Sequence, residues 1–283
     1  MAADIAFLIM AHDRPEALSA LLDDLAGTGQ PVFLHVDRTA RRFDAPMSRF
    51  ADRAVCLPRR KVIWGGYSQL QAILALLEAA HAQSAARYFM LLSNACVPVR
   101  PYAELSALLA GSDREFIDQF TRERAKADNR IRRLDRYYLM RKRIPRFIGI
   151  EINKLLRHVP RRPFAEDFGE ARFGGTWWAL SRDFVDWLLA FRKTNPGFDQ
   201  RFRMTQFSDE AYFQTALGLS PFADRIAPSL TYADWTDAAA AHPKMLDRSD
   251  LPAIDASGRF FARKYLRESD PDLTAELSAR WRG

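Results

Sequence analysis

The chain has 283 residues, of which 48% are hydrophobic and 27% are charged. A chain of this length can bury a sizeable core, and this composition excludes a wholly disordered protein. It has two cysteines, Cys56 and Cys96, too few for a disulfide framework or a cysteine-rich metal site. No apolar run approaches the roughly 20 residues needed to cross a bilayer. The formal net charge of +7 favours an acidic partner, such as nucleic acid, an anionic membrane surface or a phosphorylated small molecule.

The first 120 residues alternate between short apolar runs and amphipathic stretches. The apolar runs predict strands at 5–10, 32–36 and 88–92, and leucines at helical spacing predict helices after Asp13 and after Gly66. We expect Asp13 to cap the first of these helices, with Pro15 in its first turn. The alternation predicts a mostly parallel sheet with helices on both faces.

Ligands on such sheets bind beyond the carboxyl ends of the strands. Asp37 follows the second predicted strand, and the loop Ser93–Pro98 follows the third. We therefore expect both segments to lie at the same edge of the sheet, where a ligand binds.

Residues 121–163 contain 15 of the 42 lysines and arginines and are interrupted by three prolines. We interpret this segment as an exposed, partly helical insertion over one face of the sheet. A solvated surface is the favoured interpretation, and a docking face for an anionic acceptor or a membrane is the alternative. Nucleic acid has little support, because no recognition motif accompanies the charge.

Regular patterns return after the insertion. Residues 173–180 are strand-like, and Ser181 is expected to cap the following helix. Ser208-Asp-Glu210 is expected to open another helix, and a charged helix is predicted from about residue 266. No change in composition marks a second domain.

Several common catalytic motifs are missing from the sequence: Gly-x-Gly-x-x-Gly, the Walker loop, His-Glu-x-x-His and Gly-x-Ser-x-Gly. Asp-x-Asp occurs once, as Asp270-Pro-Asp272 in the charged tail. A metal–diphosphate site should follow a sheet strand, so this position is a poor one for it. The missing motifs therefore argue against a dinucleotide cofactor, a P-loop nucleotide site and a zinc site.

Short motifs in a fixed order resemble one family. They are Phe7-Leu-Ile-Met-Ala-His12, His35-Val-Asp37, Trp64-Gly-Gly-Tyr-Ser68, Leu91-Leu-Ser-Asn-Ala-Cys-Val-Pro98, Gly174-Gly-Thr-Trp-Trp-Ala-Leu-Ser-Arg182, Ser208-Asp-Glu-Ala-Tyr-Phe-Gln-Thr215, Tyr232-Ala-Asp-Trp235, His242-Pro-Lys244 and Phe260-Phe-Ala-Arg-Lys-Tyr265. Together they resemble the core-2/I-branching enzyme family, glycosyltransferase family 14, which includes β-1,6-N-acetylglucosaminyltransferases and peptide O-xylosyltransferases. The resemblance implies an α/β fold of the GT-A nucleotide-sugar type and an inverting, metal-independent transfer from a UDP-sugar.

The resemblance assigns the chemical roles. An inverting transfer needs a base for the acceptor hydroxyl, and Glu210 stands where the family has its catalytic glutamate. The departing diphosphate needs positive charge, which Lys264 and Arg263 of the Phe-Ala-Arg-Lys motif would supply, with Lys244 as a further cation. Asp209 is the competing candidate for the base. We expect it instead to cap the helix or to orient the base, and to lie on the acceptor side of the site.

The nucleotide half of the site is expected to include His12, Asp37, Trp64, Gly65 and Ser68. Two of these residues have a structural alternative. Asp37 either contacts the nucleoside or caps the turn after its strand, and His12 is interpreted preferentially as a satisfied structural histidine.

Trp177 and Trp178 are adjacent and should point to opposite faces of a strand. Core packing is the favoured interpretation for the pair, and one ring is available as an acceptor platform. Two positions depart from the family pattern. Cys96 stands where many members have an acid, and Gly175-Thr176 replaces the commoner Ser-Gln.

We therefore expect a single domain over 1–283, with a nucleotide half (1–120), the basic insertion (121–168) and an acceptor and catalytic half (169–283). The expected donor carries N-acetylglucosamine or xylose, and the acceptor is a glycan, a peptide or a lipid-linked molecule. The alternative is a non-catalytic sugar- or nucleotide-binding protein on the same scaffold. The start of the chain lacks a basic region of the secretory type, which predicts a cytoplasmic protein with optional peripheral membrane contact.

Overall fold

The structure is a computed structural model that describes residues 5–40, 43, 47–127, 130, 133–140, 146–236 and 242–283. Within these ranges, no helix combines the length and the apolar character that crossing a membrane requires.

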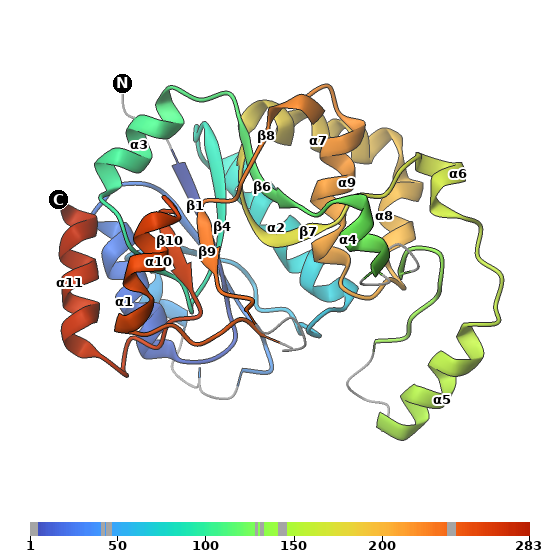
Figure 1. Cartoon of the computed structure of the whole chain (residues 1–283), viewed down its shortest axis with the longest axis horizontal. Helices are drawn as coiled ribbons and strands as arrows, with labels where there is room; N and C mark the ends of the chain where they lie inside the picture. The colour runs from blue at the N-terminus through green and yellow to red at the C-terminus, as the bar shows by residue number, and fades with distance from the viewer. Residues whose placement is uncertain are drawn as a thin grey trace.

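A seven-stranded sheet lies at the centre, in the order β3-β2-β1-β4-β7-β6-β8 (Figure 1). Its strands are β1 (Ile5–Ala11), β2 (Val32–Val36), β3 (Val55–Cys56), β4 (Tyr88–Ser93), β6 (Glu115–Gln119), β7 (Gly174–Ser181) and β8 (Ile226–Ala227). Strand β7 runs antiparallel to both β4 and β6, and the other pairs are parallel. This mostly parallel sheet confirms the predicted fold class and is consistent with a GT-A-type fold.

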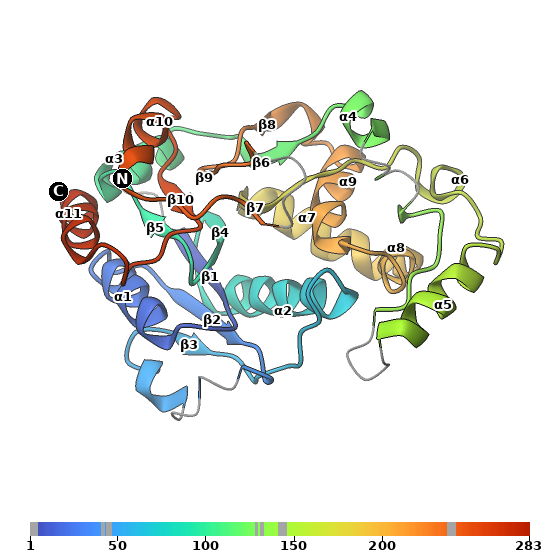
Figure 2. The same ribbon diagram turned by 60° about the horizontal axis from the view of Figure 1, so that its bottom comes forward.

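Helices cover both faces of the sheet. They are α1 (Pro15–Ala26), α2 (Tyr67–Gln83), α3 (Tyr102–Ala110), α7 (Arg182–Thr194), α8 (Pro196–Phe202), α9 (Tyr212–Leu219), α10 (Leu251–Ala256) and α11 (Pro271–Arg282), with short 3-10 turns η1 (Met47–Phe50), η4 (Ala223–Arg225) and η5 (Arg248–Asp250). Along β1, Phe7 and Ile9 pack in the core formed with α1, α3 and α11, whereas Leu8 packs in the core formed with α2, α7 and α9. Successive strand residues face opposite ways, so one apolar run supplies both cores. Figure 2 shows α1 and α2 on opposite sides of the sheet.

A second sheet of three short strands joins distant parts of the chain, in the order β5-β10-β9. Its strands are β5 (Val97–Pro98), β9 (Thr231–Ala233) and β10 (Phe261–Arg263). Strand β10 pairs antiparallel with β5 and parallel with β9. Three of the sequence motifs therefore meet in this sheet, which the sequence did not predict.

The helix starts test the predicted caps. Ser181 Oγ accepts a 3.2 Å hydrogen bond from the Phe184 amide, which confirms it as the cap of α7. The prediction for Asp13 is wrong: Arg14, with φ of 50°, is the residue that caps α1, without a side-chain hydrogen bond. The Asp13 carboxylate instead accepts from Asn94 Nδ2 at 3.1 Å, in the loop after β4. Asp13 therefore bonds to a residue distant in the sequence and not to the amides at the start of α1.

The prediction of a helix at Ser208 is correct only in part. Residues Ser208–Glu210 form a 3-10 turn, η3, and α9 begins at Tyr212. The charged tail does form a helix, α11, and Asp270 caps it through a 2.8 Å hydrogen bond from the Leu273 amide.

The basic insertion is partly helical, as predicted, with α4 (Arg122–Ala127), α5 (Arg146–Leu156) and α6 (Phe164–Phe168). Ala125, Leu134 and Phe164 of the insertion pack in the core on the face covered by α2, α7 and α9, whereas its helix α5 does not cover the sheet. In Figures 1 and 2, α5 lies at the outer edge of the molecule, far from the central strands. Four of its predicted surface cations lie outside the described residues, namely Arg132, Arg141, Lys142 and Arg143.

Candidate active site

Arg263 and Lys264 lie at the end of β10, against the loop that follows β4. The Tyr265 amide donates a 3.1 Å hydrogen bond to the Ala95 carbonyl of that loop, and the Lys264 carbonyl accepts one of 2.8 Å from Leu246. The small sheet therefore holds two basic residues at the carboxyl end of a parallel strand. The loop that follows β4 lies at the edge of the central sheet where a ligand was expected.

These two cations are short of compensating negative charge. Burial and the neighbouring charge of Arg263 lower the pKa of Lys264, and Asp13 opposes this only in part. In the described part of the chain, no carboxylate lies within salt-bridge distance of the Lys264 ammonium. Burial also lowers the pKa of Arg263, and a hydrogen bond with Cys96 opposes this; among the described residues, its Nε has no hydrogen-bond partner. An anion bound here would be stabilised by both side chains.

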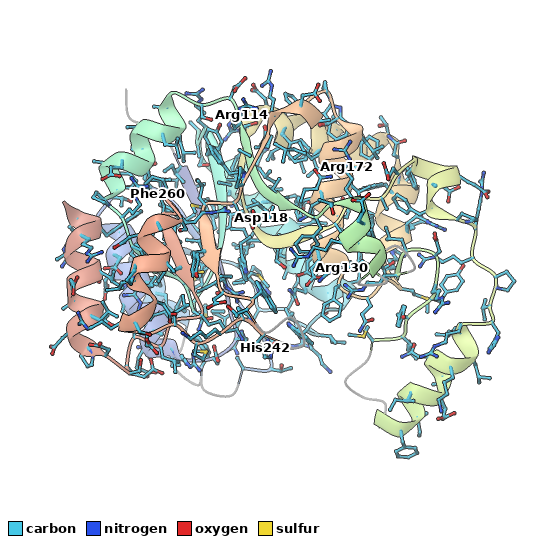
Figure 3. The ribbon with its side chains drawn as sticks, in the orientation of Figure 1. Arg114, Asp118, Arg130, Arg172, His242 and Phe260 are labelled. Carbon is cyan, nitrogen blue, oxygen red and sulfur yellow. The ribbon has the colours of Figure 1, made fainter. Side chains whose placement is uncertain are left out.

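Two histidines lie beside Arg263 and Lys264, the two residues that we call the cationic group. Burial lowers the pKa of His242, and the charges of Lys264, Arg263 and His12 lower it further. The side chain of His12 is 69% exposed, so its interpretation as a satisfied structural histidine is wrong. Figure 3 shows His242 below β9, near the middle of the molecule.

The structure does not bring Lys244 into the cationic group. Its Nζ donates a 2.6 Å hydrogen bond to Asp250 Oδ1, and nearby acids raise its pKa. The motif His242-Pro-Lys244 thus places its histidine beside the cationic group, and the expectation that Lys244 is a further cation of the diphosphate site has no support from its position. The electrostatic partners of a lysine depend on the tertiary structure, so the motif by itself did not distinguish the two.

The Trp64-Gly65 loop packs against the turn that carries Glu210. Gly65 has φ of +68°, and its carbonyl accepts a 2.6 Å hydrogen bond from the Phe207 amide. The Phe207 ring lies edge-on to Trp64, with centroids 5.0 Å apart, and Trp64 also lies 5.4 Å from the His242 ring. Through these two ring contacts, Trp64 connects the residues around the cationic group with the turn that carries Glu210. The Trp64 side chain is 54% exposed, so this connection lies at the surface.

Ser68 and Asp37 organise the approach to this loop. Ser68 Oγ accepts a 2.8 Å hydrogen bond from the Ile63 amide. The buried Asp37 accepts from the Thr39 amide at 2.9 Å and from the Val62 amide at 3.1 Å. These bonds support the capping alternative for Asp37, and contact of either residue with a nucleotide stays a prediction.

Asp209 is buried and locks the η3 turn to two elements. Its Oδ2 accepts hydrogen bonds from Gln69 Nε2 of α2 at 2.7 Å and from Thr176 Oγ1 of β7 at 3.0 Å. Burial, together with the charge of Glu210, raises the pKa of Asp209 to about 7. Its burial and its hydrogen bonds to two separate elements fit a positioning role better than contact with an acceptor.

Glu210 is partly exposed and lies between two arginines of the insertion. Its Oε2 is 2.5 Å from Arg130 Nη1 and 3.2 Å from Arg133 Nη1, and 26% of its side chain is exposed. Figure 3 shows Arg130 beside α4. The sequence analysis missed both arginines as site residues; the one available signal was the charge density of the insertion.

The tryptophan pair divides as predicted between the two faces of β7. Trp178 is buried in the core, 4.8 Å from the Phe213 ring, whereas Trp177 is partly exposed. The Arg263 guanidinium lies 4.3 Å above the Trp177 ring. Trp177 therefore borders the cationic group and is the ring available as a platform. Among the residues that the structure describes, no group of three or more His, Cys, Asp or Glu side chains is arranged to hold a metal ion.

A mostly parallel sheet with a cationic group beside the loop that follows β4 fits the class of nucleotide-sugar glycosyltransferases. The model of the Core-2/I-Branching enzyme family matches residues 5–257, and the chain belongs to this family. This confirms the resemblance seen in the motifs. The protein is therefore a glycosyltransferase, with a nucleotide-sugar donor and a glycan acceptor. No curated protein matches the chain.

Proposed function

We propose that the protein is an inverting, metal-independent glycosyltransferase that uses a UDP-sugar, with N-acetylglucosamine or xylose as the transferred sugar. The observation that carries this proposal is the pair Arg263 and Lys264, only partly compensated by negative charge, at the end of β10 beside the loop that follows β4. A departing nucleoside diphosphate develops negative charge, which a fixed pair of cations stabilises. These side chains would take the part that a divalent ion plays in other enzymes of this fold.

In the proposed step, the acceptor hydroxyl attacks the anomeric carbon while the bond from that carbon to the diphosphate oxygen breaks. The hydroxyl proton passes to Glu210. Arg130 and Arg133 both contact Oε2, so Oε1 is the oxygen proposed to take the proton. Asp209 positions this turn through Gln69 and Thr176.

One observation favours the second candidate, a non-catalytic sugar- or nucleotide-binding protein on the same scaffold. The Glu210 carboxylate is already paired with two arginines, as a purely structural acid would be. The two candidates differ in whether Glu210 is required for turnover.

A donor panel tests the proposal directly. Titration calorimetry with UDP-N-acetylglucosamine, UDP-xylose, UDP-glucose and UDP, in excess chelator, should show binding of UDP and of at least one UDP-sugar. Nuclear magnetic resonance of the product should then show an inverted anomeric configuration. Binding that requires added Mn²⁺ or Mg²⁺ would contradict the metal-free mechanism, and donor binding without turnover on any acceptor would favour the second candidate.

A further inference from the structure

Helix α5 carries an apolar face toward solvent. Among the described residues, its Leu155 and Phe147 are the most exposed large hydrophobic side chains, at 70% and 69%, and Ile148 is 40% exposed. Ile150 is 48% exposed and lies on another side of the helix, about 60° from Asn153. We call Phe147, Ile148 and Leu155 the α5 apolar face. Single exposed apolar side chains are ordinary on a protein surface, but a grouped set usually marks an interaction site.

The opposite side of α5 attaches the helix to the protein. Asn153 Oδ1 accepts a 2.7 Å hydrogen bond from the Leu139 amide, and Asn153 Nδ2 donates one of 3.3 Å to the Leu139 carbonyl. At about 100° per residue, the α5 apolar face lies about 120–160° around the helix from Asn153. The apolar side chains therefore point outward, at the edge of the molecule that Figure 1 shows.

The stretch of sequence that contains α5 is strongly positive. Residues 136–162 contain nine lysines and arginines and one acid, Glu151, a net charge of +8, whereas the rest of the chain has 33 basic and 34 acidic residues, a net charge of −1. The single acid, Glu151, lies on the same side of α5, about 40° around the helix from both Phe147 and Leu155. Its carboxylate is paired with Lys154, whose Nζ lies 2.7 Å from Glu151 Oε1. Arg157, just after the helix, is exposed. The charge of the whole protein is thus concentrated in the segment that bears the α5 apolar face.

We propose that α5 docks the protein on an anionic phospholipid membrane, lying in the plane of the interface with its apolar face among the acyl chains. A helix that combines an outward apolar face with surrounding lysines and arginines has this mode of binding. Nucleic acid would leave Phe147 and Leu155 in water. A second copy of the chain would bring two segments of charge +8 together, which opposes association.

Vesicle flotation with the full chain tests the proposal, without reference to sugar transfer, so its failure is distinct from failure of the proposed function. We expect the protein to float with vesicles of phosphatidylcholine containing 30% phosphatidylglycerol, and to bind pure phosphatidylcholine at least tenfold less. The double variant Phe147→Gln/Leu155→Gln should lower partitioning to the anionic vesicles about tenfold or more, because two apolar side chains no longer enter the membrane. Arg157→Gln should lower it about fivefold.

The matched control is Val55→Gln/Leu108→Gln, which replaces two apolar side chains that are 43% and 39% exposed and lie outside the insertion. It should float like the wild-type protein. Thermal melts should show that both double variants fold, since all four side chains are exposed. A wild-type protein that fails to float, or an α5 double variant that floats like the control, would overturn the proposal. Retention on immobilised polyglutamate without vesicle binding would also overturn it, in favour of an acidic protein partner.

Discussion

Arg130, just after α4, donates a 2.5 Å hydrogen bond to Glu210, which lies 80 residues later in the chain. Arg133 contacts the same oxygen at 3.2 Å and also lies 4.9 Å from the Phe207 ring. Their side chains are only 17% and 19% exposed. Part of the basic insertion is therefore built into the site, although a solvated surface was the favoured interpretation of its charge.

Replacing Glu210 by glutamine should abolish transfer while leaving the fold and donor affinity nearly unchanged. Glutamine keeps the shape of the side chain and an oxygen for Arg130, but it cannot accept the hydroxyl proton. We expect turnover to fall about 10²–10⁴-fold, the usual contribution of a general base. Initial rates and calorimetry of UDP binding check the two halves of this prediction.

The control for this variant is Glu104→Gln on α3, which also removes an acid that is paired with an arginine, Arg100. It should keep wild-type turnover. Wild-type turnover in Glu210→Gln would remove Glu210 as the base and make Asp209 the next carboxylate to test.

Replacing Lys264 by alanine should weaken UDP binding by about 1.5–3 kcal/mol, the contribution of a charge-assisted hydrogen bond. Lys244→Ala should weaken it less, because the Lys244 ammonium is held by Asp250 at 2.6 Å. Uridine, which lacks phosphate, should bind both variants like the wild-type protein. Titration calorimetry in excess chelator measures the UDP and uridine affinities of both variants and of the wild-type protein. An equal loss of uridine and UDP affinity in Lys264→Ala would mean that the residue only supports the fold.

Asp209 should make stability fall as the pH rises. Its pKa in the folded protein, about 7, lies above the ordinary value of 3.8, so between these pH values the native state keeps a proton that the unfolded state has lost. This contribution is complete below pH 4 and is lost as the pH rises to 7, with a slope of at most about 1.4 kcal/mol per pH unit. Asparagine keeps an oxygen for Gln69 and Thr176 but does not titrate. We expect the stability of Asp209→Asn relative to wild type to increase from pH 5 to pH 7.

Urea unfolding at pH 5, 6 and 7 measures this difference. The control is Asp113→Asn, because the Asp113 side chain is 70% exposed. Its stability relative to wild type should change little over the same range. A pH-independent difference for Asp209→Asn would show that Asp209 titrates normally.

Replacing Gly65 by alanine should destabilise the protein more than replacing Gly29. Both glycines have positive φ, +68° and +69°, so both substitutions incur a backbone cost of about 1–2 kcal/mol. A Cβ on Gly65 would also lie 2.7 Å from Phe207 Cε1, whereas nothing lies within 4 Å of one on Gly29. The Phe207 ring is held between Trp64 and Arg133, so this contact should add about 1–3 kcal/mol.

Denaturant unfolding of both glycine variants gives the comparison, and Gly65→Ala should also lose turnover because Phe207 precedes the Glu210 turn. Equal destabilisation by the two substitutions would show that the loop relaxes away from Phe207 without cost.

The sequence alone determined the local features of this protein. The strand at 32–36 was predicted with its observed bounds, and Ser181 was identified as a cap, because an apolar run and a capping serine act within a few residues. The order of the short motifs also identified the family. Adjacent side chains on a strand must face opposite ways, so the division between Trp177 and Trp178 was predictable without knowing what each would contact.

The tertiary structure decided which distant groups meet. Strands β5, β9 and β10 have only two or three residues each, too few for a periodic pattern, and they form only because they pair with one another. The partners of Asp13, Lys244 and Glu210 depend equally on where remote segments fold. A charged side chain pairs with whatever opposite charge the packed chain places beside it, and no local pattern encodes which residue that is. For this reason the sequence singled out Glu210 as a candidate, and only the fold placed Arg130 and Arg133 beside it.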